Sequence, residues 1–142
     1  MEKTTGPRPS PPREQMLIAA CFLVSLVLIL LMLLWLHSTG GLYPEDVVTL
    51  MTQVLGLYAT PFGVILGGMF ARKDKPQPKH AGVLFLVAIA LVVIWNLLIL
   101  WRTAVFVLAT DGQASSFAAE LTQLANASLF LVSGMLAYYF AK

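Results

Sequence analysis

The feature that most constrains this chain is a series of four apolar runs, each long enough to cross a bilayer. They cover residues 16–36, 47–71, 82–101 and 117–140. A helix needs ~20 apolar residues to cross ~30 Å of hydrocarbon. With 58% hydrophobic and only 11% charged residues, the chain has too little polar surface to cover a soluble globule. The sequence therefore predicts an all-α polytopic membrane protein with four transmembrane helices.

The four runs leave little room for any other domain. Residues 1–15 contain four closely spaced prolines, a composition that favours an extended or disordered tail. The first apolar run is longer than the ~7–15 residues of a signal-peptide core, which predicts an uncleaved anchor. Residues 16–142 are accordingly predicted to form one four-helix transmembrane domain.

Basic residues predict how the chain is threaded. Lysine and arginine favour the cytoplasmic side of short loops. In the four-span arrangement, eight of the nine lie in the tail, in the connection 72–81 or at Lys142, and Arg102 alone falls on the other side. Both termini are therefore predicted to be cytoplasmic, in a membrane we expect to be the inner (plasma) membrane of a bacterium.

The second run carries a face of small and polar residues. On a helical wheel, seven of them fall within about 100° of arc. They are Thr49, Thr52, Gly56, Ala59, Thr60, Gly63 and Gly67. Small residues at four-residue spacing, as at Ala59, Gly63 and Gly67, let two helices approach closely in lipid. Pro61 removes one backbone hydrogen bond from the same run and predicts a kink.

The fourth run carries a similar stripe. Its members lie within about 60° of one another on the wheel: Ser115, Ala119, Thr122, Asn126, Ser133 and Ala137. Asn126 needs a hydrogen-bond partner because an unpaired amide in hydrocarbon is costly. The third run has no such stripe, and its Asn96 predicts a single buried polar contact.

These stripes support two interpretations that the sequence cannot separate. In the first, they join the helices of one four-helix bundle to each other. In the second, the face of the second run lies on the axis of a homo-oligomer and lines a pore, where threonine side chains and glycine backbones offer weak, repeated polar sites. Close packing and pore lining use the same residues.

An ion pair is predicted between Arg102 and Glu120. The two residues flank the turn at Asp111-Gly112, so they should come level in an antiparallel hairpin. The alternative is that each is satisfied alone: Arg102 extends to lipid phosphates, and Glu120 lies in the first turns of a helix, where the dipole favours a carboxylate.

The motifs of catalysis and of metal or cofactor binding are missing. His37 and His80 fall on opposite sides of the predicted membrane, so one subunit cannot combine them in a metal site. The single cysteine excludes an internal disulfide. We therefore expect no enzymatic activity, no cofactor, no metal and no nucleic-acid partner.

The function that these patterns favour is a homo-oligomeric channel or membrane-permeabilising effector. Its expected partners are the lipid bilayer and other copies of itself. The alternative is an accessory or scaffold subunit, whose small-residue faces dock on other membrane subunits. A small-solute transporter is less favoured, because the chain has no internal repeat and no charge deep in a span.

Overall fold

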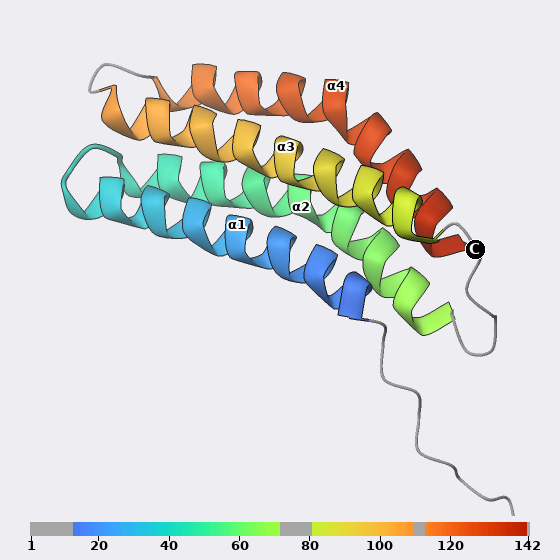
Figure 1. The fold of residues 1–142 in the computed structure, drawn as a ribbon. Helices are drawn as coiled ribbons and strands as arrows, with labels where there is room; N and C mark the ends of the chain where they lie inside the picture. Colours follow the sequence, from blue (N-terminus) through green and yellow to red (C-terminus); the bar gives the residue numbers. More distant parts are fainter. Residues whose placement is uncertain (1–12, 72–80, 110–112, 142) are drawn as a thin grey trace, which may run out of the picture.

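The computed structural model describes residues 13–71, 81–109 and 113–141. Within these ranges it has four α-helices: α1 (Arg13–Ser38), α2 (Pro44–Ala71), α3 (Ala81–Leu108) and α4 (Ala114–Ala141). The helices lie side by side in one elongated bundle (Figure 1). α1, α2 and α3 each contain a stretch long and apolar enough to cross a membrane. Over its described residues α4 is not among these candidate spans.

The helices extend beyond the apolar runs. Residues 13–15, predicted to belong to the tail, form the first turn of α1, and α3 continues from residue 101 to Leu108. An apolar run marks where a helix meets hydrocarbon, whereas the helix itself ends where its backbone bonding ends. Residues 1–12 of the predicted tail, most of the basic connection 72–81, the turn at Asp111-Gly112 and Lys142 lie outside the described residues.

A glycine ends α1 and fixes the tight turn into α2. Gly40 has a φ of 80°, a left-handed conformation that glycine adopts without steric cost. The Gly40 amide donates to the His37 carbonyl at 3.0 Å, and the Gly41 amide donates to the Leu36 carbonyl at 2.9 Å. This pair of bonds is the Schellman arrangement that satisfies the last carbonyls of a helix. The loop is closed further by His37, whose Nδ1 donates to the Leu42 carbonyl at 3.0 Å.

α2 begins at Pro44, with Glu45 and Asp46 in its first turn. Proline suits this position because an amide hydrogen in the first turn of a helix has no carbonyl partner within the helix, so its absence costs nothing. The two carboxylates interact favourably with the positive end of the helix dipole. Pro61 lies inside α2 and is buried, yet the helix continues through it to Ala71.

The order of the helices around the bundle differs from their order in the chain. α1 packs against α2 and α3, and α4 packs against α2 and α3. Because consecutive helices reverse direction (Figure 1), α1 runs parallel to α3 and α2 runs parallel to α4. The bundle therefore consists of two helical hairpins laid against each other. Its α1/α3 edge and its α2/α4 edge lie on opposite sides.

Aromatic rings fill the middle of the bundle. The Phe22 ring centroid lies 5.6 Å from that of Trp95 and 6.1 Å from that of Tyr58, and the centroids of Tyr58 and Trp95 are 5.1 Å apart. Separations of ~4.5–7 Å are those at which aromatic pairs attract. Three helices thus contribute one ring each to the same layer, so the centre of a single bundle is solid.

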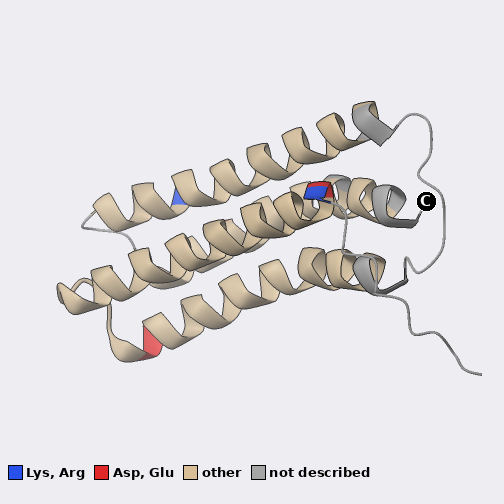
Figure 2. Cartoon of the chain, turned by 60° about the horizontal axis from the view of Figure 1, so that its bottom comes forward, with Lys and Arg blue, Asp and Glu red and all other residues tan. Residues whose placement is uncertain are grey.

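Charged residues occupy few positions along the described helices (Figure 2). Arg13 and Glu14 lie in the first turn of α1, and Glu45 and Asp46 in that of α2. The remaining charged residues of the described ranges are Arg102 and Glu120. A charge is costly at the bilayer centre, so this distribution agrees with residence in a membrane.

Candidate functional site

The small-residue face of α2 points away from the bundle. All seven of its predicted members are exposed. The residues that α2 buries are Val47, Leu50, Val54, Tyr58, Pro61 and Ile65. Helical spacing places these two sets about 180° apart around the helix. The structure thus uses the large side chains of α2 for the core and leaves the small ones on the outside.

The glycines of this face confirm that no neighbouring helix lies against it in the single chain. A Cβ atom added at Gly56, Gly63 or Gly67 would meet no other atom within 4 Å. Glycines that mediate close packing would be in contact with the opposing backbone. The first of the two interpretations requires this face to join α2 to another helix of the same bundle. Among the described helices it does not do so.

The stripe on α4 has a similar position. Ser115, Ala119, Thr122, Asn126 and Ala137 are exposed, and Ser133 is partly buried. α4 turns a different side to the core. Its buried residues are Phe117, Ala118, Leu121, Ala125, Val132 and Leu136, centred about 110° from the stripe.

The two stripes belong to one side of the molecule. Phe62 faces α1, where its ring lies 6.1 Å from that of Phe22, so the opposite flank of α2 adjoins α4. Thr49, Gly56, Thr60 and Gly67 lean toward that flank by helical spacing. On α4, Glu120 faces α3 through its bond to Arg102, and the stripe lies on the flank away from it. We call the exposed small residues of both helices the α2/α4 face.

Most hydroxyl groups on the α2/α4 face are satisfied locally. Thr49 donates to the Glu45 carbonyl at 2.9 Å, Thr52 to that of Val48 at 2.8 Å, and Thr122 to that of Ala118 at 2.9 Å. A helix can carry such threonines into lipid at little cost because the donor bonds its own backbone. The hydroxyl groups of these three threonines therefore need no hydrogen-bond partner from another helix.

The amides on α4 are not satisfied. No described residue forms a hydrogen bond with the side chain of Gln123 or Asn126, and both are exposed. Two further polar atoms, Gln53 Oε1 and Ser133 Oγ, are buried and have no partner within the described structure. The unpaired amide of Asn126 is the feature of the α2/α4 face that most needs explaining, because an amide without a partner is costly in an apolar environment.

The core contains a polar cluster that sequence reasoning identified only in part. The Tyr58 hydroxyl donates to Asn96 Oδ1 at 3.0 Å, and Ser25 Oγ lies 2.8 Å from the same hydroxyl. Asn96 Nδ2 donates to the Val92 carbonyl at 2.8 Å. The sequence predicts a buried polar contact for Asn96, but it does not predict which residues are the partners. Ser25 interrupts a leucine-rich run and Tyr58 lies mid-span, and these interruptions were the available signals.

Arg102 and Glu120 form an ion pair between α3 and α4 through Nη2 and Oε2. Their side chains are 37% and 54% exposed, so the pair lies on the surface of the bundle. It links α3 to α4 across the surface of the bundle.

Metal binding finds no support in the part of the chain that the structure describes, where no three His, Cys, Asp or Glu side chains come together. His80 lies outside the described residues. Comparisons of the chain with protein-family models, with curated proteins and with solved structures gave no match.

Proposed function

We propose that the protein assembles in the membrane through the α2/α4 face into a homo-oligomer, and that polar residues of this face line a pore between the copies. The observation that carries the proposal is the exposed amide of Asn126 in the α4 stripe, which has no hydrogen-bond partner in the described chain. The α2/α4 face also carries a row of small residues open to contact on α2.

The argument requires α4 to lie in the membrane with the other helices. α4 packs along α2 and α3, both of which are long and apolar enough to span. We infer that α4 spans with them, with both termini on the cytoplasmic side. Asn126 then lies near the bilayer centre, where an unpaired amide costs several kcal/mol. A second protein surface or water in a pore removes that cost.

A second copy of the chain suits this face because copies share one orientation in the membrane. Each residue of the face then lies at the same depth in the membrane as its equivalent in the neighbouring copy. Thr52 lies toward the end of the bundle at which α2 and α4 begin, Asn126 lies near the middle of α4, and Gly63 and Gly67 lie toward the other end. A symmetric ring would therefore pair amides with amides and glycines with glycines.

Permeation would have to occur between copies. The middle of one bundle is occupied by the rings of Phe22, Tyr58 and Trp95. Threonines and amides around an oligomer axis provide polar contacts for water and ions in one half of the membrane, and the glycines form the narrow half. Such weak, repeated sites permit conduction.

The first experiment measures the native mass of the purified protein in a mild detergent with lipid retained. We expect a defined homo-oligomer. Gly56→Leu and Gly63→Leu should weaken each interface by about 1–3 kcal/mol, because a bulky side chain is placed where backbones meet. Gly134→Leu is the matched control: Gly134 is also exposed, with open space around it, and it lies about 85° from the α4 stripe.

Ion flux through liposomes then tests the pore. Asn126→Leu should reduce both flux and assembly, since it removes an amide from the shared surface, whereas Gly134→Leu should leave both unchanged. A monomer with no flux would refute the proposal. A species that is stable only with a different co-purifying membrane protein would instead make the α2/α4 face a docking surface of an accessory subunit.

A further inference from the structure

Threonine hydroxyl groups on the α2/α4 face present acceptors rather than donors. Thr49 and Thr52 of α2 and Thr122 of α4 each donate the hydroxyl hydrogen to a backbone carbonyl of their own helix, at 2.8–2.9 Å. A hydroxyl has one hydrogen and two acceptor lone pairs, so these side chains offer only oxygen lone pairs to a solute. Lone pairs of this kind coordinate cations, whereas an anion needs N–H or O–H donors. The Asn126 amide offers both kinds of group and does not discriminate.

A carboxylate continues this row of acceptors beyond Thr49. Glu45 lies one helical turn before Thr49 and points in the same direction around α2 as Gly63. It is exposed, and no described residue forms an ion pair or hydrogen bond with its carboxylate. Asp46 lies about 100° further round the helix; it is half-buried and lines a pocket with Gln113 at the start of α4. Glu45 is therefore the acidic residue of α2 that lies on the α2/α4 face.

The charges at this end of the bundle favour cations once the opposing terms are counted. Arg102 is the described arginine at this end, and its ion pair with Glu120 cancels its charge. Both α2 and α4 begin here, and each helix dipole adds the equivalent of about half a positive charge. The carboxylates of Glu45 and Asp46 lie in the first turn of α2 and add two negative charges. The balance for each chain is negative.

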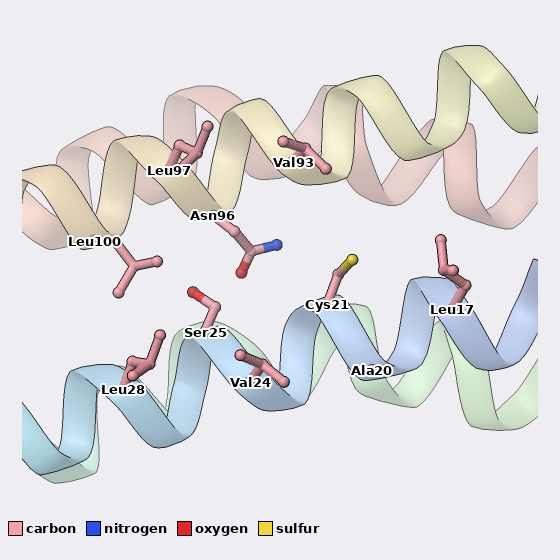
Figure 3. Close-up of a pocket in the computed structure, with 10 residues that line it drawn as sticks. All are labelled: Leu17, Ala20, Cys21, Val24, Ser25, Leu28, Val93, Asn96, Leu97 and Leu100. Atoms are coloured by element: carbon pink, nitrogen blue, oxygen red, sulfur yellow. The ribbon is translucent and has the colours of Figure 1, made fainter.

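The opposite edge of the bundle offers ions no comparable row of polar groups. Figure 3 shows the Asn96 amide extending from α3 toward α1 and the Ser25 hydroxyl pointing back toward α3. Both residues are buried, and both bond the Tyr58 hydroxyl. The side chains around them are those of alanine, cysteine, valine and leucine. A path along α1 and α3 would be apolar, so the polar path is the α2/α4 face.

We propose, as an extension that rests on the pore proposed above, that this pore admits cations in preference to anions and that Glu45 sets the preference. In a symmetric assembly the Glu45 side chains of all copies lie at one depth and form a ring at the mouth, the arrangement that selects cations in channels. Thr49 and Thr52 follow one and two turns further along α2. A mouth potential of about one kT enriches cations and depletes anions by ~2.7-fold each, which gives a permeability ratio of about seven.

Reversal potentials across planar bilayers test this proposal on the full chain. The purified assembly is reconstituted and placed in a KCl gradient near 0.1 M, where the Debye length is ~10 Å. We expect a PK/PCl of about seven or more. Glu45→Gln keeps the shape of the side chain and removes its charge, and it should lower the ratio about five- to sevenfold. Glu45→Lys should invert the preference.

Asp46→Asn is the matched control, because it removes the same charge one residue away. It should lower the ratio by no more than about twofold, since this carboxylate lies off the face and its field is screened. The native mass of each variant shows that assembly is retained. A wild-type ratio of one or less, or an equal fall in Asp46→Asn and Glu45→Gln, would overturn the inference and leave the pore standing. An intact assembly that carries no current would instead refute the pore itself.

Discussion

The Tyr58 hydroxyl joins three helices in the bundle centre. It contacts Ser25 of α1 at 2.8 Å and Asn96 of α3 at 3.0 Å. Tyr58→Phe removes only this oxygen and keeps the ring that packs against Phe22 and Trp95. Any loss of stability therefore reports the hydrogen bonds rather than the aromatic contacts.

The size of the effect follows from the two bonds. An interhelical hydrogen bond in a membrane contributes ~0.6 kcal/mol on average and at most ~1.7 kcal/mol, so losing both should cost about 1–3 kcal/mol. Ser25 can recover by donating to the carbonyl four residues earlier in its own helix. Asn96 Oδ1 has no such substitute among the described residues, so its loss should dominate.

Reversible unfolding in mixed micelles, followed by tryptophan fluorescence as the SDS fraction rises, measures this free energy. Tyr43→Phe is the control because Tyr43 is 79% exposed. A double-mutant cycle of Tyr58→Phe with Ser25→Ala should show a coupling of about 0.5–1.7 kcal/mol. If Tyr58→Phe matched the control and the cycle were additive, the buried polar cluster would not stabilise the fold.

Three further predictions concern single contacts. Arg102→Glu should lower stability by about 0.2–1 kcal/mol, and adding Glu120→Arg should restore it; no recovery in the unfolding midpoint would show that the ion pair is unimportant. Ala125→Leu should destabilise the monomer by about 1–3 kcal/mol because Ala125 is fully buried, whereas Ala119→Leu should not; equal midpoints would contradict the orientation of α4. Gly40→Ala should cost about 1 kcal/mol because of its positive φ, and an unchanged midpoint would exclude that turn geometry.

Much of the architecture could be predicted from local patterns. An apolar run of bilayer length specifies a helix because a single segment in lipid can pair its backbone N–H and C=O groups only by helical hydrogen bonds. Three such helices are present in the structure. The start of α2 at Pro44 and the turn at Gly40 follow equally from residue chemistry. These features depend on interactions between residues that are close together in the sequence, so they could be predicted without the tertiary structure.

The sequence alone could not decide which face of a helix turns inward. A face of small residues fits another helix of the same bundle and another copy equally well, since the same contacts serve both. In the tertiary structure the larger side chains of α2 occupy the core, including Tyr58 and Ile65, and Gly56 and Gly63 are left outside. Large side chains gain more dispersion contacts when buried.

The partners of buried polar groups were also fixed only by the tertiary structure. Asn96 could be recognised as needing a partner, but Tyr58 is 38 residues away and reaches it because the two hairpins pack with α1 beside α3 and α2 beside α4. That helix order is set by how whole faces fit together. Sequence therefore determined the elements and their environment, and packing determined which side chains meet and which remain free for a partner.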